Sequence, residues 1–334
     1  MQIGFGSLGR HITKSILNRE NLELVAVVDA NPALAKKPIK ELLEDEVDSN
    51  ISLTNDLQTV LKGVPADIAL VATSSSLEAV SPVIKACLDN GLDVISICEE
   101  LSFPYRKSPD LAEKLDRVAK EKGKTVVGTG INPGYLMDLL PIVLTGPCQS
   151  VDTIKVTRHM NSSHRRPSFQ KKIGTGMTKE EFRKNIDEGK ITGHVGLVES
   201  IQMIDAALNL GLDKIEELPP EAIIAKNKIA NSFTTIEKGD VLGLRSMGVG
   251  KRKGEQIVTL DFQAYAEATP QYDEVIIEGL PRMHQRIEGG VQGDHGTIGM
   301  LLNLIPLVIH ESPGLKTMKD LPVPRNTMRF WKED

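Results

Sequence analysis

The chain has 334 residues, of which 40% are hydrophobic and 25% charged, with a formal net charge of −5. This length suits two domains, the composition is that of a globular protein, and the acidic balance gives no reason to expect nucleic acid as a partner. No apolar run is long enough to span a bilayer, no signal peptide is apparent, and the three cysteines are scattered without metal spacing. We therefore expect a cytoplasmic protein without disulfides, metal or membrane contact.

The opening segment MQIGFGSLGR contains a glycine-rich turn with the GxGxxG spacing of a dinucleotide-binding fingerprint. In such a turn Gly4 permits the tight bend, Gly6 lets the backbone approach the pyrophosphate, and Gly9 allows close helix–strand packing. The helix that follows directs the N–H groups of Ser7 and Leu8 toward the phosphates. Spacing alone is weak evidence, because a related domain that binds no nucleotide can contain the same turn.

An acidic residue at the expected distance supports the nucleotide interpretation. Asp29 closes the next apolar run, 20 residues after Gly9, where a carboxylate accepts hydrogen bonds from the adenine ribose. A carboxylate repels a 2′-phosphate, so this position favours NAD. Lys36 and Lys37 follow and can reach such a phosphate, which keeps NADP open, although a solvated helix face explains them at least as well.

The first strand is short for a dinucleotide turn, because only Met1 to Ile3 precede the first glycine. We expect a few strand residues to precede Gln2 in the parent protein, and a lower cofactor affinity without them.

Strand and helix patterns alternate over the first part of the chain. Continuous apolar runs rich in β-branched residues suit strands buried on both faces of a parallel sheet; they are Leu24–Val28, Ile68–Ala72, Val94–Ile97 and Thr125–Gly128. Apolar residues at helical spacing separate these runs. The alternation predicts an α/β fold, with a Rossmann-type parallel sheet over residues 1–134.

The pattern changes from about Gln149. The segment QIVTLDFQAYA, residues 256–266, alternates apolar and polar side chains, which predicts a half-exposed strand of an open mixed or antiparallel sheet, and residues 273–278 offer it a partner strand. Helices are expected at 179–187 and 195–210. We therefore predict a second α+β domain over 135–293, followed by a C-terminal helix and tail, 294–334, that return to the first domain.

Polar residues follow several of the predicted strands, and ligands of open α/β sheets bind beyond the carboxyl ends of strands. Thr73, Ser74 and Ser75 can line the nicotinamide ribose, although a helix N-cap explains such a run as well. Asn132, in the turn GINPG, can hold the nicotinamide amide or the substrate, or simply shape the turn.

Two acids, Glu99 and Glu100, end the strand at 94–97. They are hard to explain structurally, because a buried carboxylate is costly without a partner. One can act as a general base or bind an ammonium group, and strand alternation lets only one point toward a ligand. The alternative is that both cap the turn at 102–104.

Arg158, Asn161 and His194 are the candidates of the second domain for binding a substrate carboxylate. Each residue type is more often structural, but His194 stands at a predicted helix start. His159 and His164 have no third ligand at metal-binding spacing, so no metal site is predicted.

Four stretches together resemble the 2,4-diaminopentanoate dehydrogenase family, namely QIGFGSLGR, SICEELSFPY, GTGINPGYLMD and GDHGTIGMLLNLIPLVIHESPGLKTMKDLPVP. The resemblance covers essentially the whole chain, and CEEL and INPG are its specific parts. The family includes NAD(P)-dependent amine dehydrogenases, and its fold is similar to that of dihydrodipicolinate reductase.

The resemblance implies oxidative deamination of 2,4-diaminopentanoate or a related primary amine to a ketone and ammonia, and reductive amination in reverse. It implies that Glu99 is the catalytic glutamate, with Glu100 as the fallback, and that Asn132, Arg158 and His194 line the substrate pocket. A homodimer is expected, partly from the resemblance and partly from the exposed face of the alternating strand.

Two alternatives stay open. One is a dihydrodipicolinate-reductase-like imine reductase, although the paired histidines and lysine typical of that class do not occur in this sequence. The other is a non-catalytic NAD(P)-binding sensor, against which the acidic pair argues.

Overall fold

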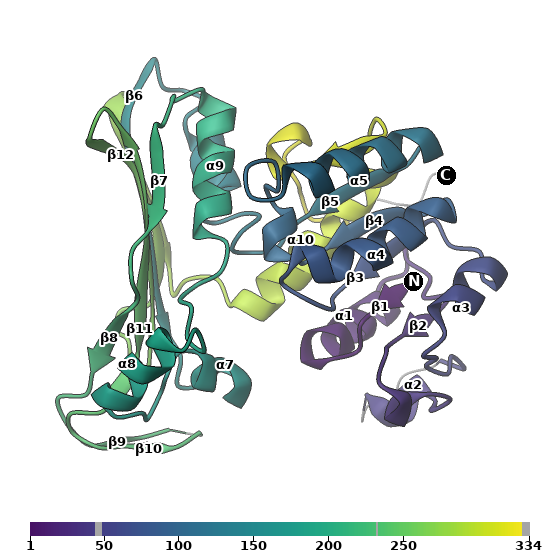
Figure 1. The fold of residues 1–334 in the computed structure, drawn as a ribbon, viewed down its shortest axis with the longest axis horizontal. Coiled ribbons are helices and arrows are strands. Elements are labelled where there is room, and N and C mark those ends of the chain that lie inside the picture. Colours follow the sequence, from purple (N-terminus) through teal and green to yellow (C-terminus); the bar gives the residue numbers. More distant parts are fainter. Residues whose placement is uncertain (44–48, 232, 329–334) are drawn as a thin grey trace. The chain divides into compact units, whose positions relative to one another are not determined.

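The computed structural model describes residues 1–43, 49–231 and 233–328. Contacts within the chain define two compact units, shown in Figure 1. Unit 1 comprises Met1–Tyr135 and Gly293–Asp334, and unit 2 comprises Leu136–Gln292.

Unit 1 is built on a six-stranded sheet in the order β15-β5-β4-β3-β1-β2, in which every neighbouring pair is parallel. The strands are β1 (Gln2–Ile3), β2 (Val27–Val28), β3 (Ile68–Val71), β4 (Asp93–Ser96), β5 (Thr125–Gly128) and β15 (Gly314–Lys316). The helices are α1 (Ser7–Leu17), α2 (Ile39–Leu42), α3 (Leu57–Gly63), α4 (Leu77–Asp89), α5 (Pro109–Lys122) and α10 (Gly293–Ile309). This sheet confirms the Rossmann-type fold.

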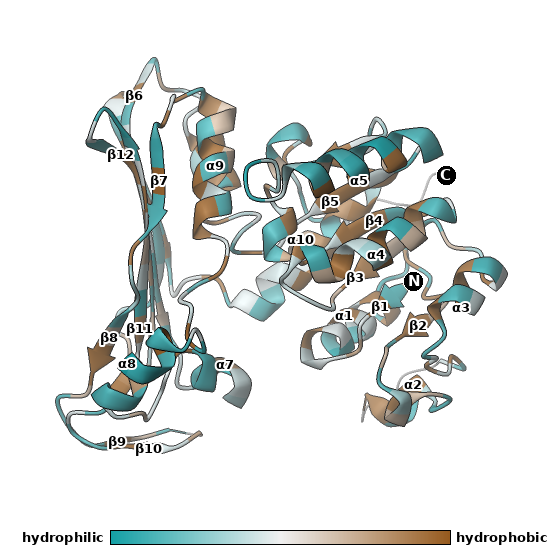
Figure 2. Ribbon diagram, in the orientation of Figure 1, coloured by the Kyte–Doolittle hydropathy of each residue, from teal (hydrophilic) through white to brown (hydrophobic). Residues whose placement is uncertain are grey.

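Helices cover both faces of this sheet, as the continuous apolar strands require. One core cluster joins α4 and α5 to alternate strand residues, among them Ile3, Val71 and Val94, and no residue of α10 belongs to it. Helix α10 instead contacts α1 and strands β3, β4 and β5. Figure 2 shows the resulting pattern of apolar strands beneath helices with hydrophilic outer surfaces.

The first two strands are shorter than the sequence suggests. Of the apolar run at 24–28, only Val27 and Val28 form strand β2. Gln2 and Ile3 nevertheless pair on both sides, with β2 and with β3. The glycine turn is therefore preceded by an ordered strand, although that strand is only two residues long.

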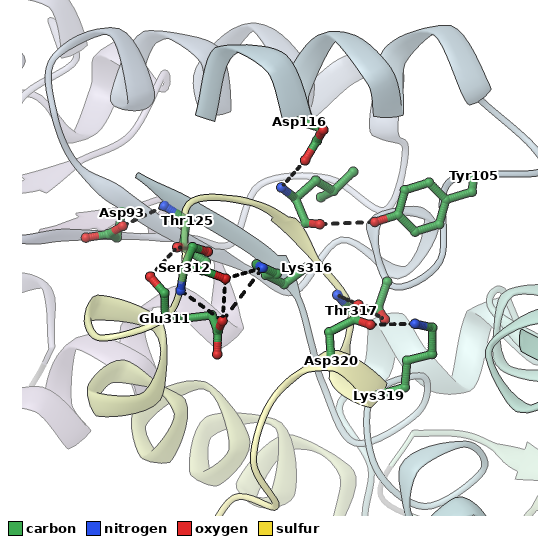
Figure 3. Close-up of polar contacts among 11 residues, drawn as sticks. Asp93, Tyr105, Asp116, Thr125, Glu311, Ser312, Lys316, Thr317, Lys319 and Asp320 are labelled. Carbon is green, nitrogen blue, oxygen red and sulfur yellow. Dashed lines mark hydrogen bonds and ion pairs between the residues drawn. The ribbon is translucent and has the colours of Figure 1, made fainter. Parts of the chain in front are cut away.

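The C-terminal segment supplies the sixth strand of this sheet, and Figure 3 shows the polar contacts that hold it. The Leu315 N–H donates to Asp116 at 3.0 Å, and the Leu315 carbonyl accepts from the Tyr105 hydroxyl at 3.1 Å. At the start of the strand, the Thr125 hydroxyl donates to the Ser312 carbonyl. Burial, together with the charges of Asp320 and Asp116, raises the pKa of Tyr105 to about 12, so this anchor stays protonated at neutral pH.

Unit 2 contains a seven-stranded sheet in the order β14-β13-β6-β12-β11-β7, with β8 also paired to β11. Its strands are β6 (Ser150–Asn161), β7 (Lys214–Glu217), β8 (Glu221–Ile224), β11 (Val241–Arg252), β12 (Glu255–Tyr265), β13 (Tyr272–Leu280) and β14 (Met283–Glu288). The remaining elements are α6 (Leu139–Leu144), α7 (Pro167–Lys172), α8 (Lys179–Asp187), α9 (Leu197–Leu208) and the hairpin β9 (Ile229–Ala230) and β10 (Thr235–Ile236). The expected α+β unit on an open mixed sheet is confirmed.

The alternating segment at 256–266 forms β12, but its neighbours differ from the prediction. Strand β12 lies inside the sheet, parallel to β6 and antiparallel to β11, and the expected partner at 273–278 pairs with β6 instead. The long strand β6, the first strand of the unit, lies between β12 and β13. Local periodicity identifies a strand but carries no information about such a non-local neighbour.

Helix α9 covers one face of this sheet, and two glycines of β11 allow its close approach. A Cβ atom at Gly248 would lie 3.0 Å from Ile201 Cδ1, and one at Gly250 would lie 2.9 Å from Ile201 Cγ2. Val258 of β12 lies on the same face beside Gly250. Thr259 and Asp261 therefore belong to the opposite face.

Thiol labelling provides a simple test of burial in this fold. Burial raises the pKa of both Cys87 and Cys98 to about 12, whereas Cys148 is half-buried. Because the thiolate is the reactive species, an alkylating reagent should modify only Cys148 in the native protein and all three cysteines after unfolding, as read from the intact mass. A Cys148→Ser variant should stay unlabelled under native conditions, and rapid native labelling of that variant would contradict the structure.

Candidate active site

The glycine turn between β1 and α1 contains two glycines that the protein itself requires. Gly4 has φ +93°, and a Cβ there would lie 2.3 Å from the Ala72 carbonyl oxygen. A Cβ at Gly9 would lie 2.0 Å from the Gly4 carbonyl oxygen. These distances are far below van der Waals contact, so both positions demand glycine for turn geometry and helix–strand packing.

Gly6 differs, because a Cβ there would meet nothing within 4 Å. It is the N-cap of α1, with an extended backbone that any residue adopts, and it provides no side-chain cap for the amides of Ser7 and Leu8. Protein packing therefore gives no reason for glycine at this position, whereas a close backbone approach by a pyrophosphate does. The turn fits a dinucleotide.

The adenine end of such a dinucleotide would lie at the carboxyl end of β2. Asp29 follows that strand, and its Oδ2 accepts the Phe5 N–H at 2.5 Å while Oδ1 accepts the Asn31 N–H at 2.8 Å. Asp29 is thus directly joined to the glycine turn by this hydrogen bond. The Arg10 guanidinium lies 4.8 Å above the Phe5 ring, which places a cation beside this turn that the sequence analysis did not identify.

Replacing Gly6 with alanine should separate cofactor binding from folding. The variant is expected to melt like the wild type, because the added methyl enters open space, but to bind NADH at least about tenfold more weakly. Isothermal titration calorimetry measures the affinity, and Gly63→Ala, which also adds its methyl to open space, is the matched control. If Gly6→Ala binds NADH as tightly as the wild type, the nucleotide does not bind at this turn.

The serine-rich loop after β3 adjoins the same turn. A Cβ at Gly4 would lie 3.0 Å from Thr73 Cγ2, so Thr73 is a neighbour of the glycine turn. The Ser74 hydroxyl accepts the Ser76 N–H at 3.1 Å, which fixes the local bend. The Ser75 carbonyl oxygen accepts the Cys98 thiol at 3.1 Å and the Glu100 N–H at 3.4 Å. The loop is therefore held between the turn and the acidic pair.

The acidic pair lies in a short 3-10 helix, Glu99–Leu101, that follows β4, so strand alternation does not govern its side chains. The Glu100 carboxylate is fully engaged: Oε2 accepts the Leu77 N–H at 2.8 Å and Oε1 pairs with Lys107 Nζ at 2.8 Å. Glu99 is half-buried, and its backbone carbonyl accepts the Ser102 N–H at 3.1 Å, whereas its carboxylate has no hydrogen-bond or ion-pair partner within the described part of the chain.

Burial would raise the pKa of Glu100, but the hydrogen bonds from Lys107 and from the Leu77 N–H outweigh it and lower the pKa. Glu100 is thus held as a carboxylate by its partners. Its two oxygens are occupied, which leaves Glu99 as the acid of the pair that can meet a ligand.

Asn132 stands in a tight turn after β5. The Asn132–Pro133 peptide bond is cis, and a Cβ at Gly134, which has φ +125°, would lie 2.3 Å from the Gly130 N atom. The Ile131 N–H donates to Thr297 Oγ1 of α10 at 3.3 Å. The turn is rigidly shaped at the carboxyl edge of the sheet, where the glycine turn, the serine loop and the acidic pair also lie.

In unit 2, strand register brings two of the predicted residues together. Across β11, β12, β6 and β13, the residues Ser246, Phe262, Arg158 and Asp273 stand opposite one another in one row. The His194 ring stacks on Phe262 with a centroid distance of 4.1 Å, and the backbone N–H of His194 donates to the Ser246 hydroxyl. Arg158 and His194 therefore flank the same phenylalanine.

Asn161 lines the same cavity as Arg158, but its side-chain oxygen is engaged by backbone N–H groups. Its side-chain oxygen accepts the N–H groups of Ser163 at 2.9 Å and Glu267 at 3.1 Å. Three positions after Arg158 on the same strand, its side chain belongs to the opposite face of the sheet. Asn161 thus shares a cavity with Arg158, whereas His194, which stacks on Phe262, is not among the residues that line it.

Arg158 is 3% exposed, and its side chain and that of Asp273 both hydrogen-bond to the backbone of Val291. Its Nη2 donates to the Val291 carbonyl at 2.5 Å, and the Val291 N–H donates to Asp273 at 2.7 Å. Burial lowers the pKa of Arg158 and raises the pKa of Asp273, and their mutual attraction opposes both shifts.

One nitrogen of the Arg158 guanidinium is buried without a partner. Among the described residues, its buried Nη1 atom has no hydrogen-bond partner. Arg158 also lines a cavity of about 200 Å³, whose wall includes Arg165, Asp273 and the turn at Gly289–Val291. A guanidinium with an unused donor beside a cavity is a ready site for a carboxylate.

Within residues 1–43, 49–231 and 233–328, no group of three or more histidine, cysteine, aspartate or glutamate side chains could hold a metal ion. No helix in that part of the chain is long and apolar enough to cross a membrane.

Comparisons with known proteins match the two parts of the chain to two family models, the second of which also includes the C-terminal segment of unit 1. Residues 2–97 match the N-terminal domain of dihydrodipicolinate reductase, and residues 135–333 match the C-terminal domain of 2,4-diaminopentanoate dehydrogenase. The solved amine dehydrogenase of Mycobacterium smegmatis is 22% identical, with a TM-score of 0.84 over 98% of this chain and 97% of that one, which shows a shared fold.

Two curated proteins resemble the chain over nearly its full length. An amine dehydrogenase of Streptomyces virginiae is 23% identical over 96% of the chain and 95% of its own length. The 2,4-diaminopentanoate dehydrogenase of Acetoanaerobium sticklandii is 35% identical over 99% of the chain and 95% of its own length. With the glycine turn, the acidic pair and both domain matches in place, the chain belongs to the 2,4-diaminopentanoate dehydrogenase family of NAD(P)-dependent oxidoreductases that act on amines.

Proposed function

We propose that the chain oxidises 2,4-diaminopentanoate at carbon 4 to 2-amino-4-oxopentanoate and ammonia, with NAD as the preferred cofactor, and catalyses the reductive amination in reverse. The observation that carries this proposal is the Glu99 carboxylate. It stands at the cofactor-binding edge of the parallel sheet, and no described protein group neutralises it.

Glu99 acts in several steps of this proposal. Its carboxylate binds the substrate ammonium ion and accepts one proton from it, which gives a neutral amine. Glu99 releases this proton to solvent, and the restored carboxylate stabilises the iminium cation that forms when a hydride leaves carbon 4. When bound, the nicotinamide supplies the acceptor for that hydride. The Glu99 carboxylate then takes a proton from the water molecule that attacks the iminium carbon and passes it to the nitrogen of the resulting carbinolamine. The C–N bond breaks and ammonia leaves, while the carbinolamine hydroxyl gives its proton to Glu99 and becomes the ketone oxygen.

Arg158 supports a substrate that carries a carboxylate. Its open Nη1–H group and the adjoining cavity suit one carboxylate oxygen, and the neighbouring stack of His194 on Phe262 offers a flat apolar wall for the carbon chain. A simple amine would leave the guanidinium donor unused. This contrast favours a diamino or amino acid over a simple alkyl amine.

Asp29 supports NAD over NADP. Its carboxylate is fixed beside the glycine turn by the N–H groups of Phe5 and Asn31, where the adenine ribose would lie. A 2′-phosphate in that place would face a fixed negative charge. Arg10, Lys36 and Lys37 are the cations that can offset this repulsion, so activity with NADP should be lower rather than absent.

A panel of three amines with both cofactors tests the proposal, by following the absorbance of the reduced cofactor. The highest kcat/KM is expected for 2,4-diaminopentanoate with NAD, and 4-aminopentanoate should retain most of it. 2-Aminopentane, which lacks the carboxylate, should lose about 10–100-fold, the value of a hydrogen bond to a charged group. Equal rates for all three amines would show that no carboxylate is recognised.

Adding dihydrodipicolinate with reduced cofactor to this panel also separates the alternatives. The match of residues 2–97 to dihydrodipicolinate reductase favours an imine reductase as the second candidate, but the match to 2,4-diaminopentanoate dehydrogenase covers the part of the chain that contains Arg158 and His194. Reduction of dihydrodipicolinate without turnover of any amine would support the reductase. NADH binding without turnover of either substrate would support a sensor.

We propose that the chain forms a homodimer through the sheet face of unit 2 opposite α9. That face carries an ordered charge network, in which Arg245 makes two hydrogen bonds of 2.8 Å to Asp261, whose side chain is 5% exposed. Light scattering should give twice the mass of one chain, and Thr259→Arg, a bulky charge on that face, should give the mass of one. A wild-type protein with the mass of a single chain would contradict the proposal.

A further inference from the structure

The loop that follows the acidic pair brings one lysine back to it. Residues 102–108 leave the 3-10 helix, and Lys107 near the end of this loop pairs with Glu100 at 2.8 Å. The Glu100 side chain is 20% exposed and that of Lys107 is 52% exposed. The other Glu100 oxygen accepts the N–H of Leu77, the first residue of α4.

Helix α4 depends on this distant carboxylate for its N-terminus. Its N-cap, Ser76, makes no side-chain capping bond, so the Glu100 carboxylate takes the place of a cap from 23 residues away. A negative charge at a helix N-terminus also interacts favourably with the helix dipole. Lys107 keeps the carboxylate charged and holds it in one orientation.

The same contacts fix the serine loop just before α4. The Ser75 carbonyl accepts from both Cys98 and the Glu100 N–H, so this residue is tied to the acidic segment at two points. Thr73, at the other end of the loop, adjoins Gly4. The position of the loop between these anchors is therefore set by the acidic segment and its lysine.

The lysine loop is itself anchored to the C-terminal strand. The Tyr105 hydroxyl donates to the Leu315 carbonyl of β15, as Figure 3 shows, and the Tyr105 ring packs edge-on against Phe103 at 5.3 Å. The Ser108 N–H closes the loop on the Pro104 carbonyl at 2.9 Å. Lys107 therefore extends to Glu100 from a loop whose position is held by these contacts.

We propose that Lys107 and Glu100 are a positioning pair for the nicotinamide half of the cofactor. They act through the loop at Thr73–Ser75, which is the candidate contact for the nicotinamide ribose, while Glu99 remains free for the substrate. The proposal rests on the cofactor position assigned to the glycine turn but does not depend on the identity of the amine.

Calorimetric titration with NADH and with ADP tests the pair without any turnover. Lys107→Met should raise the Kd for NADH about threefold, the scale of a half-exposed ion pair, and Glu100→Ala, which also removes the helix cap, should raise it about tenfold. ADP contains only the adenine and diphosphate part, so its Kd should stay unchanged in both variants.

Two controls keep this test specific. Lys85→Met removes a lysine charge that lies on α4 and pairs with Asp89 at the surface, away from the acidic pair. It should leave the affinities for NADH and ADP unchanged. Lys107→Arg should restore NADH binding, because it restores the ion pair. Equal losses of NADH and ADP affinity would overturn the proposal, and so would unchanged NADH affinity in both Lys107→Met and Glu100→Ala. If the NADH affinities change as expected but no amine is turned over, the result counts only against the proposed substrate.

Discussion

Replacing Glu99 with glutamine is expected to lower kcat for deamination about 10²–10⁴-fold, the usual contribution of a general acid–base group. Glutamine has nearly the same shape but cannot accept the ammonium proton or carry the charge that stabilises the iminium. The Kd for NADH should stay within experimental error, because the Glu99 carboxylate makes no hydrogen bond or ion pair within the described residues, and its backbone bond to Ser102 is kept in the variant.

Glu100→Gln is the matched control, since the two residues are neighbours in one 3-10 helix. Its carboxamide oxygen can still accept the Leu77 N–H, and only the charge interaction with Lys107 is lost. A few-fold change in NADH affinity with kcat largely retained is expected. If Glu100→Gln stops turnover and Glu99→Gln does not, the catalytic role belongs to Glu100 and the assignment made here is wrong.

Replacing Arg158 with methionine is expected to lower the free energy of unfolding by about 3–5 kcal/mol, because it leaves Asp273 as a buried charge without its partner. Urea unfolding at neutral pH measures the loss. The double variant Arg158→Met/Asp273→Asn should recover most of the stability, since no unpaired charge remains. Lys120→Met, which breaks an exposed pair with Asp116, should cost no more than about 1 kcal/mol.

Kinetics separate the two roles of Arg158. The stabilised double variant should still show a raised KM for 2,4-diaminopentanoate and an unchanged KM for 2-aminopentane, because the guanidinium donor is absent in both variants. If the double variant recovers its normal KM along with its stability, Arg158 is a structural residue only and the carboxylate site lies elsewhere.

The pH dependence of this pair has a definite sign. Burial raises the folded-state pKa of Asp273 above its unfolded value, even against the attraction of Arg158. The native state therefore binds more protons than the unfolded state between these two values, and the stability contributed by this group falls as pH rises through that window. Without the attraction of Arg158, the folded-state pKa of Asp273 rises further. The stability difference between wild type and Arg158→Met should therefore be smaller at mildly acidic pH than at neutral pH.

Local signals were sufficient for much of the fold. Helix α8 has the predicted bounds, 179–187, because a Thr178 capping box starts it with a clear sequence signature. Helix α5 ends at Gly123, whose φ of +64° is the left-handed conformation that a glycine C-cap predicts. The buried strands of unit 1 were equally visible, since a parallel sheet covered on both faces requires continuous apolar runs.

Strand β11 was missed, and its glycines explain why. Gly248 and Gly250 lower the apparent strand propensity of the segment, yet they are there because α9 lies directly on them. The reason for these glycines is a contact with a helix some 50 residues earlier in the chain, which a local pattern does not contain.

The candidate site divides in the same way. The glycine turn, Asp29 and the acidic pair follow strands and could be located from the sequence alone. The row of Ser246, Phe262, Arg158 and Asp273 depends on the register of four strands, and Lys107 depends on the return of a loop. The sequence also did not show which of Glu99 and Glu100 is engaged by protein partners, because both lie in a 3-10 helix, where strand alternation does not apply.

The central claim is that the amine-bearing carbon of the substrate gives its hydrogen directly to the nicotinamide. Mass spectrometry of the reduced cofactor, formed from 2,4-diaminopentanoate with deuterium at carbon 4, tests this claim directly. We predict one deuterium in each reduced cofactor and one ammonia released with it. Reduced cofactor without deuterium, or formed without ammonia, would contradict the proposed reaction.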